Sequence, residues 1–366
     1  MQTPAARGPG WGRHPGWGRH PGWGRHPGWG GDPGGDPDHV PVVPVVLDVD
    51  TGVDDACAIL LAALHPLLDL RAVTCVDGNA PVADVVRNTM IALDAAGRAD
   101  VPVARGADRP LLEIPLDARH VHGADGMGDL GWDPSGQAAD PRHAVELLRD
   151  LCGEARSVGR PLTLVLLGPL TNVALLLRTY PGVAEGVAAI VFMGGSAHSG
   201  NATASAEFNI FHDPEAAAIM LDAASSLGIP VTMYGLDVFY APVVSRDQAA
   251  QLIAVGGGSA AELGGRLIDF QCRRFDREAA TIGDAGAVCA VIDPAGITTA
   301  ALPMRIELAG TWPRGRTIVD PRDWSGDLVH DPHGQAPARV DVVLEVDAVR
   351  YADIWRGTLL GTSKSA

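Results

Sequence analysis

Positive charge is scarce in this sequence. Lys364 is the single lysine, and 28 lysine and arginine residues stand against 44 aspartates and glutamates, which gives a net charge of −16. A nucleic-acid partner requires a basic face, and an anionic membrane surface attracts basic segments. The charge balance therefore predicts that the protein binds neither nucleic acid nor membranes.

Paired cysteines and long apolar runs are also missing. The five cysteines are scattered, and none forms a C-x-x-C pair. We therefore expect reduced thiols in an apolar core rather than disulfides or a zinc site. No apolar run reaches the roughly 18 residues of a membrane span, and no charged start followed by an apolar stretch indicates a signal peptide. Together these features predict a cytoplasmic protein.

The first forty residues differ in kind from the rest. The hexapeptide GWGRHP occurs three times in succession from Gly10, and glycine and proline are too dense there to build a core. We predict that residues 1–40 form a disordered tail. The whole chain is 46% hydrophobic, as expected of a protein with a sizeable core, and residues 41–366 are predicted to form one catalytic domain.

Strand-like and helix-like patterns alternate from residue 41 onwards. Near-continuous apolar runs, which are typical of strands buried on both faces, occur at 41–50, 67–76, 101–106, 161–168, 187–195 and 229–238. Helical patterns occur at 54–66, 80–97, 170–181 and 213–224. This alternation predicts an α/β fold with a doubly wound, mostly parallel central sheet and helices on both faces. Three alternating segments after Ala300, at 304–312, 315–321 and 339–347, are predicted to be edge strands or hairpins.

Polar residues and glycines follow several of these strands. Asp48 and Asp50 come at the end of the first strand, Asp77 and Asn79 follow the second, and Gly194 and Gly195 follow the run at 187–193. In such folds ligands bind outside the carboxyl ends of the strands. We therefore expect one site at this edge of the sheet.

Four aspartates, Asp48, Asp50, Asp54 and Asp55, lie within eight residues beside apolar runs. Like charges repel, and carboxylates near an apolar core are costly to keep ionised. Converging carboxylates without basic partners usually hold a hard divalent cation. Helix capping explains Asp54 or Asp55 alone, because aspartate is favoured at helix starts, but explains all four less easily.

Two families resemble this acidic segment. "DVDTG" partly resembles the D-x-D-x-T loop of haloacid-dehalogenase-type phosphatases, whose first aspartate is a nucleophile beside magnesium. That family also needs a downstream basic residue, for which Lys364 is a poor candidate, and gives Asp54 and Asp55 no role. "DVDTGVDDA" resembles more fully the D-x-D-x-G-x-D-D-A signature of the inosine–uridine-preferring nucleoside hydrolases.

The second resemblance extends along most of the chain. "VDGN", "HGADGMG", "LGPLTNVA" and "GTWPRGRTIVDPR" are similar to further segments of that family. "FMGGSAHSGNATASAEFNIFHDPEAA" is the longest and most specific match. The resemblance covers about Val43 to Ile354 and implies the nucleoside-hydrolase version of the α/β fold.

The resemblance also implies roles for individual residues. A bound Ca²⁺ would be held by Asp50, Asp55, Asp284 and the main-chain carbonyl of Leu167. Asp54 would be the general base that takes a proton from the attacking water, and Asp48 would orient the ligands. The substrate would be held by a larger set: Asn79, His122, Met193, Asn201, Glu207 and Asn209. The implied reaction is hydrolysis of the N-glycosidic bond of a ribonucleoside, by a homodimer or homotetramer.

The sequence departs from the family at one position. Many members carry a histidine just before the last metal-ligating aspartate, proposed to protonate the leaving base, and here that position is Gly283. His122, Tyr240 or an arginine among 273, 274 and 277 could replace it, or Phe270 or Phe275 could stack on the base. A third possibility is a homologue that binds a nucleoside or ribose but has weak or no activity.

Several other polar residues have structural interpretations. Asp213, directly before Pro214, is predicted to cap the helix that follows. Glu207 and Asn209 could also serve as caps. Asn172 is interpreted as a helix-start residue, Asp77 as a turn residue, and His65 and His212 as surface or packing residues.

Overall fold

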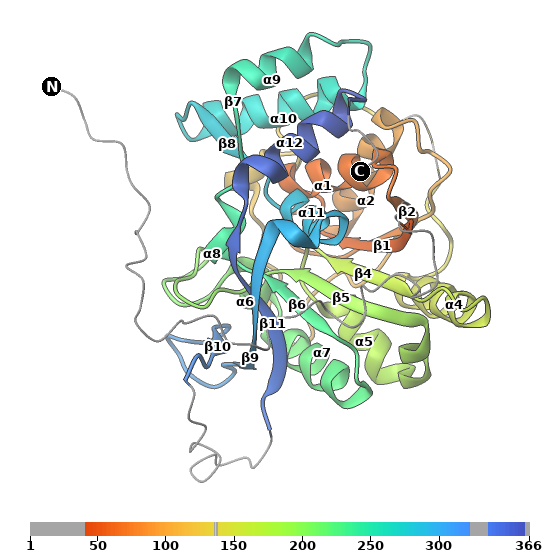
Figure 1. Cartoon of the computed structure of the whole chain (residues 1–366), viewed down its shortest axis with the longest axis vertical. Coiled ribbons are helices and arrows are strands. Elements are labelled where there is room, and N and C mark those ends of the chain that lie inside the picture. The colour runs from red at the N-terminus through yellow and green to blue at the C-terminus, as the bar shows by residue number, and fades with distance from the viewer. Residues whose placement is uncertain (1–40, 135, 137, 323–335, 363–366) are drawn as a thin grey trace, which may run out of the picture.

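The computed structural model describes residues 41–134, 136, 138–322 and 336–362. In this part of the chain, nine strands form one sheet in the order β10-β9-β11-β6-β5-β4-β1-β2-β3 (Figure 1). Their bounds are β1 Val43–Val49, β2 Leu68–Cys75, β3 Val103–Arg105, β4 Leu162–Leu166, β5 Val187–Met193, β6 Val231–Tyr234, β9 Ile297–Ile306, β10 Thr317–Val319 and β11 Ala338–Val346. The predicted tail, residues 1–40, and Lys364 lie outside the described residues.

The half of the sheet that runs from β3 to β6 is parallel throughout. Its order, 3-2-1-4-5-6, is that of a doubly wound sheet, in which the chain starts in the middle and builds outward in both directions. The predicted α/β fold with a mostly parallel sheet is therefore confirmed. β7 (Val243–Ser245) and β8 (Ala279–Thr281) pair separately as a small antiparallel ribbon.

Helices cover both faces of the sheet (Figure 1). On one face lie α1 (Val53–Leu64), α2 (Val82–Ala95), α9 (Arg246–Ile253), α10 (Ala260–Arg274), α11 (Ala285–Ile292) and α12 (Ala348–Leu359). On the other lie α4 (Ala144–Ser157), α5 (Thr171–Thr179), α7 (Pro214–Leu227) and the 3₁₀ turn η1 (Pro181–Gly186). The short helices are α3 (Arg119–His122), α6 (Phe208–His212), α8 (Leu236–Phe239) and the 3₁₀ turn η2 (Pro294–Gly296).

The apolar runs of the strands supply two cores at once. In β1, Val45, Leu47 and Val49 pack into the core beneath α1, whereas Val46 packs into the core beneath α4 and α5. Successive side chains of a strand point to opposite faces, so a strand covered on both sides must be apolar at nearly every position. This requirement explains why the first strand is apolar at nearly every position before Asp48.

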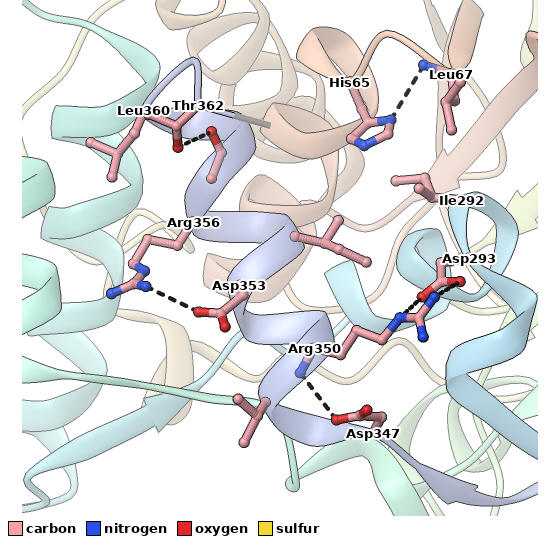
Figure 2. A pocket seen from close by; sticks show the side chains of 13 residues that line it. His65, Leu67, Ile292, Asp293, Asp347, Arg350, Asp353, Arg356, Leu360 and Thr362 are labelled. Atoms are coloured by element: carbon pink, nitrogen blue, oxygen red, sulfur yellow. Dashed lines mark hydrogen bonds and ion pairs between the residues drawn. The ribbon is translucent and has the colours of Figure 1, made fainter. Parts of the chain in front are cut away.

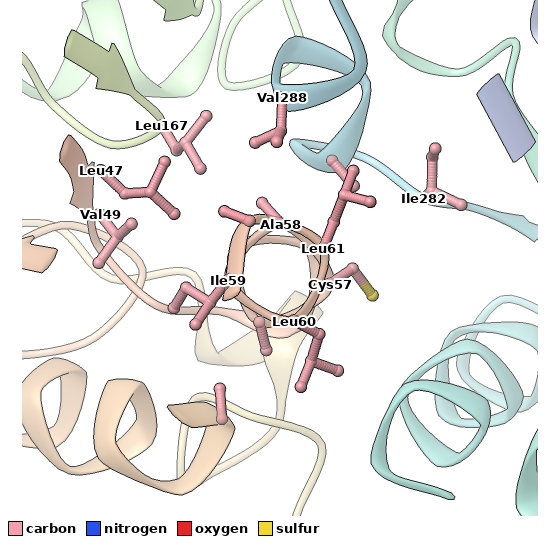
Figure 3. Close-up of a cluster of buried hydrophobic side chains, with 14 of the residues drawn as sticks. Leu47, Val49, Cys57, Ala58, Ile59, Leu60, Leu61, Leu167, Ile282 and Val288 are labelled. Atoms are coloured by element: carbon pink, nitrogen blue, oxygen red, sulfur yellow. The ribbon is translucent and has the colours of Figure 1, made fainter. Parts of the chain in front are cut away.

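α1 occupies the centre of the larger core. Figure 3 views this helix along its axis, with Leu47, Val49 and Leu167 on one side and Val288 and Ile282 on others. Nearly all of its residues after Asp54 are buried, including Asp55. The helix ends at Leu64 because Pro66 follows two residues later. Its first turn, which carries Asp54 and Asp55, is held against the carboxyl end of β1 by this packing.

The C-terminal strands extend the sheet at one edge, as predicted. β9 pairs antiparallel with both β10 and β11, and β11 pairs in parallel with β6. The boundary of the first segment was wrong: β9 begins at Ile297 and ends at Ile306, and residues 309–312 lie in the turn that leads to β10. Thr317 in β10 contacts Ser196 through two hydrogen bonds, so this edge adjoins the loop after β5.

The five cysteines are free and buried, as predicted. Among the described residues, none of the helices combines the length and the apolar character needed to cross a membrane.

Candidate active site

The site lies where parallel strands end. The loops after β1, β2, β4 and β5 all emerge at the carboxyl edge of the sheet, since these four strands are parallel neighbours. The glycines in these loops let the backbones approach closely. A Cβ at Gly78 would lie 2.1 Å from Asp50 Oδ2, and one at Gly168 would lie 2.9 Å from its Oδ1. The loops after β2 and β4 therefore both press against Asp50.

Asp54, Asp55 and Asp284 form a group of convergent carboxylates. One oxygen from each lies within 4.8 Å of the others. Asp54 and Asp55 are in the first turn of α1, and Asp284 immediately precedes α11, a helix that packs against α1. Packing of these two helices thus brings together carboxylates that are far apart in the sequence.

Asp50 and Asp55 are joined by backbone hydrogen bonds. Asp55 accepts from the N–H of Gly52 at 2.9 Å and from that of Asp50 at 3.3 Å. Asp50 accepts from the N–H of Asn79 at 2.8 Å through Oδ2. Asp50 Oδ1 and Asp54 Oδ1 are buried and have no hydrogen-bond partner among the described residues. Two acceptor atoms at the centre of the cluster are therefore open to a ligand.

Burial and mutual repulsion dominate the electrostatics of this cluster. Burial, reinforced by the charge of Asp54, raises the pKa of Asp55 to about 7. The pKa values of Asp50 and Asp284 are raised well above their usual range, first by burial and then by the neighbouring carboxylates. A divalent cation would remove this repulsion, and a donor set made only of oxygens suits a hard cation. The residues present therefore fit a metal site.

Leu167 and Asp48 connect β4 to β1 beneath the cluster. The N–H of Leu167 donates to the Asp48 carbonyl at 2.7 Å, and the Leu167 carbonyl accepts from Asn209 Nδ2 at 2.7 Å. The Asp48 carboxylate accepts from Thr74 at 2.6 Å and from Asn172 at 2.8 Å. Burial raises the pKa of Asp48 to about 7, against the effect of these two hydrogen bonds.

Asn172 does more than the sequence indicated. Its amide donates to Asp48 and to the carbonyl of Cys75, and its oxygen accepts from the N–H of Ala107. The residue is fully buried and does not cap α5, because its hydrogen bonds run to other elements. It stands in the first turn of α5, as its interpretation as a helix-start residue held, and it also joins β1, β2 and the segment after β3.

The predicted sugar-binding residues lie beside the acidic cluster. Glu207 accepts from the N–H groups of Gly195 and Asn209, each at 2.9 Å. Asn209 donates to the carbonyls of Leu167 and Met193. Burial raises the pKa of Glu207 to about 7. Glu207 also caps α6, so the carboxylate has a structural role there, and Asp213 caps α7 as predicted.

Asn79 and Asn201 approach the same region from other loops. The Asn79 side chain donates to Asp55 at 3.3 Å. Asn201 is exposed, and its Oδ1 accepts from the N–H of Phe208 at 2.9 Å. The Asn201 side chain lowers the pKa of the Tyr240 hydroxyl, against the larger effect of burial, so the two groups are neighbours.

His122 is buried beside Asp54. Its Nδ1 accepts from the N–H of Val53 at 3.1 Å and lies 3.7 Å from Asp54 Oδ1. Burial lowers the pKa of His122, although the charge of Asp54 acts in the opposite direction. A neutral imidazole whose Nδ1 accepts a hydrogen bond carries its proton on Nε2. His122 can therefore donate from Nε2.

Gly283 is in close contact with Asp54. Its φ of +56° lies in the left-handed region, and a Cβ added there would be 2.4 Å from Asp54 Cβ and 3.2 Å from the ring of Phe239. Gly283 thus allows Asp54 to lie directly against the backbone that leads to Asp284.

The surroundings of the other candidates for the contact with the leaving base differ from one another. Arg273 forms an ion pair with Asp269 at 2.7 Å, and Arg274 donates to the carbonyl of His120. Phe270 packs against the segment that contains Gly128, whereas Phe275 is about half exposed. His122 and Tyr240 are both close enough for the Asp54 carboxylate to act on their pKa.

The structure also places two further polar residues, Asp77 and His65. Asp77 was interpreted as a turn residue, but His212 Nε2 lies 3.2 Å from its Oδ2, and both side chains are buried. His65 was interpreted as a surface or packing residue, and it is a packing residue. Its Nδ1 accepts from the N–H of Leu67 at the far end of α1.

A cavity of about 750 Å³ lies away from the acidic cluster. Figure 2 shows it beside α12, with His65, Asp293 and Arg350 among its lining residues. His65 directly follows α1, whereas the acidic residues are in the first turn, about 15 Å away along a helix of this length. This cavity therefore lies at the opposite end of α1 from the acidic cluster.

The chain is similar to known hydrolases over most of its length. The family described as inosine-uridine preferring nucleoside hydrolase matches residues 45–353. An inosine-uridine preferring nucleoside hydrolase of Leishmania major is 39% identical over 280 residues, which cover 75% of this chain and 87% of that protein. The pyrimidine-specific ribonucleoside hydrolase RihA of Photobacterium profundum is 38% identical over 283 residues, covering 76% and 88%.

Solved structures agree with this similarity. A purine-preferring ribonucleoside hydrolase from Gardnerella vaginalis superposes with a TM-score of 0.76 at 29% sequence identity. The superposition covers 88% of this chain and 100% of that one.

Proposed function

Because this chain belongs to the inosine-uridine preferring nucleoside hydrolase family, whose members cleave the N-glycosyl bond of nucleosides, we propose that it hydrolyses ribonucleosides to free base and ribose with the help of a bound calcium ion. The observation that carries this proposal is the buried acidic cluster beside a set of amide and carboxylate groups suited to a sugar. Family membership also removes the basis of the phosphatase alternative.

Asp50, Asp55, Asp284 and the Leu167 carbonyl are the proposed metal ligands. Two observations favour them: the unpartnered Oδ1 of Asp50, and the close approach of Gly168 to that carboxylate. Calcium takes six to eight oxygen ligands and tolerates irregular geometry, which suits a site built from three loops. When bound, such an ion lowers the pKa of water and so eases its deprotonation.

Asp54 is the proposed general base. It is only partly buried, in contrast to Asp55, and its Oδ1 is free to accept a proton from the attacking water. His122 and the backbone of Gly283 lie next to Asp54 on two sides.

Asn79, Asn201, Glu207 and Asn209 are the proposed ribose ligands, with Met193 packed beside them. Amide and carboxylate groups can hold each sugar hydroxyl, and a missing hydroxyl would leave a buried polar group unpaired. Cleavage of the glycosidic bond passes through an oxocarbenium-like state. The negative charge of Glu207 and its acidic neighbours would stabilise that cation.

His122 and Tyr240 are the proposed contacts of the leaving base. Burial raises the pKa of the Tyr240 hydroxyl, which keeps it protonated and able to donate. The names of the relatives specify different substrates: inosine and uridine, pyrimidine nucleosides, or purine nucleosides. The base preference of this protein must therefore be measured. The family resemblance also favours a homodimer or homotetramer, which light scattering of the purified protein would test.

A nucleoside panel tests the proposed function. We expect release of ribose from several ribonucleosides, loss of turnover after treatment with EGTA, and recovery when calcium is added back. A 4-nitrophenyl riboside, whose leaving group needs no proton, should be cleaved fastest if no strong general acid replaces the missing histidine. Absence of turnover with any substrate in the calcium-loaded protein, together with measurable ribose binding, would identify a binding protein instead.

Introducing a histidine at residue 283 should reduce activity rather than restore a general acid. In Gly283→His, the new Cβ would displace Asp54, and the left-handed backbone would add about 1–2 kcal/mol of strain. We expect kcat to fall at least tenfold, as measured by steady-state kinetics, together with a lower Tm.

Gly228→His is the matched control for this substitution. Gly228 has a φ of +71°, and its Cβ position is open, so the variant adds backbone strain without a contact. We expect it to lower Tm while leaving kcat unchanged. An increase in kcat in Gly283→His would show that a side chain fits beside Asp54 and would refute this prediction.

A further inference from the structure

His212 and Asp77 form a buried pair that joins two loops of the site. His212 Nε2 lies at ion-pair distance, 3.2 Å, from Asp77 Oδ2, and the relative exposures of the two side chains are 0% and 8%. Neither atom has a hydrogen-bond partner among the described residues. The two atoms thus face each other at ion-pair distance without a well-aligned hydrogen bond. Removing one of them would leave the other buried without this polar neighbour, which is costly.

His212 is the last residue of α6, a short helix that crosses the carboxyl edge of the sheet. At its start, Glu207 accepts from the N–H of Gly195 after β5. One residue into the helix, Asn209 donates to the Leu167 carbonyl after β4. At its end, His212 reaches Asp77 after β2. α6 thus runs across the ends of the central strands and is attached to a different loop at each step.

The loop after β2 carries site residues that face those of the α6 segment. Asp77 is bound through its N–H to the Ala107 carbonyl, and Asn79, two residues later, contacts both Asp50 and Asp55. The pair therefore connects the segment that presents Asn79 to the segment that presents Glu207 and Asn209.

α7 does not depend on His212 for its own position. Asp213 caps α7 and accepts from the N–H of Leu111 and the hydroxyl of Thr171. These contacts keep the start of α7 fixed when His212 is changed. Loss of the pair should accordingly act on α6 and on the loop after β2.

We propose that His212 and Asp77 are positioning residues that hold α6 and the loop after β2 together, and so set the spacing of the ribose ligands Asn79, Glu207 and Asn209. This inference rests on the proposed function, because it assumes that these three side chains bind ribose. His212 and Asp77 themselves need not touch the substrate.

The test compares variants of this pair by ribose binding and by steady-state kinetics. His212→Leu and Asp77→Ala should each raise the Kd for ribose, measured by calorimetry, and the KM for nucleosides about tenfold, the effect typical of lost supporting contacts around a site. kcat should change less than threefold, because ground-state binding and transition-state binding weaken together. His212→Gln, which keeps a donor near the Nε2 position, should recover most of the affinity.

A double variant and a distant histidine supply the controls. In the double variant His212→Leu/Asp77→Ala, the loss of affinity should be no larger than that of the worse single variant, because both act through one contact. His65→Asn removes a buried imidazole at the other end of α1 and should lower Tm without changing the ribose Kd.

The outcomes separate this inference from the proposed function. An unchanged ribose Kd and KM in folded His212→Leu, whatever its Tm, would show a purely structural pair and overturn the inference. If that variant does not fold, the ribose Kd and the KM of Asp77→Ala or of the double variant are measured by the same criterion. The double variant leaves neither partner buried without the other. Failure of the wild-type protein to cleave any nucleoside would refute the proposed function, whereas ribose calorimetry would still decide the role of the pair.

Discussion

Asp54→Ala should lower kcat by about 10²- to 10⁴-fold, the usual contribution of a positioned general base, while the protein keeps its calcium. Asp54 is the least buried carboxylate of the cluster, and its Oδ1 has no hydrogen-bond partner in the described part of the chain. Asp50, Asp55, Asp284 and the Leu167 carbonyl remain in the variant. Steady-state kinetics and calcium calorimetry on the same preparation would measure both effects.

The control for Asp54 must account for its place in the first turn of a helix. A carboxylate there stabilises the helix by interaction with its dipole. Asp247 occupies the first turn of α9, and Asp247→Ala removes a similar interaction outside the site. We expect normal kcat in that control. Full activity in Asp54→Ala would refute the role of general base, and loss of calcium would assign Asp54 to the metal instead.

Asp55→Asn should lose both calcium and activity. The carboxylate is fully buried and accepts from Gly52, Asp50 and Asn79, so it connects the start of α1 to the rest of the cluster. Asparagine keeps the volume and one oxygen but removes the charge that a divalent cation needs. We expect the calcium affinity to fall at least a hundredfold and turnover to fall to background at micromolar calcium.

Thermal unfolding gives an independent readout for Asp55. A ligand that binds only the folded state at one hundred times its Kd stabilises that state by about 2.7 kcal/mol. Calcium should therefore raise the Tm of the wild-type protein and of Asp54→Ala, but leave the Tm of Asp55→Asn unchanged. A full calcium-dependent rise in Asp55→Asn would show that Asp55 is not a ligand.

The order of the parallel strands was readable in the sequence for a physical reason. A parallel strand that is covered on both faces must be apolar at almost every position, so β1, β4 and β5 appear as near-continuous apolar runs. The helices α4, α9, α10, α11 and α12 were not predicted. In α10, Gly264 and Gly265 are poor helix formers. Only the folded chain shows why these positions are glycines: the side chain of Leu359 lies directly against Gly264, and that of Ile253 lies against Gly265.

The sequence by itself also determined the acidic character of the site and the family to which it belongs. Asp48, Asp50, Asp54 and Asp55 are close in the chain, and the long motif that contains Glu207 and Asn209 is continuous. Such local patterns need no knowledge of packing. They were sufficient to predict a cation site at the carboxyl edge of the sheet.

Only the tertiary structure decided how the remaining residues act. The contact of Gly283 with Asp54, the three hydrogen bonds of Asn172 and the pairing of His212 with Asp77 all join segments that are distant in the chain. Each depends on which loops the parallel strands bring to the same edge. A polar residue that looks like a cap or a turn in sequence becomes a buried connection when its partner arrives from another strand, because burial obliges it to find one.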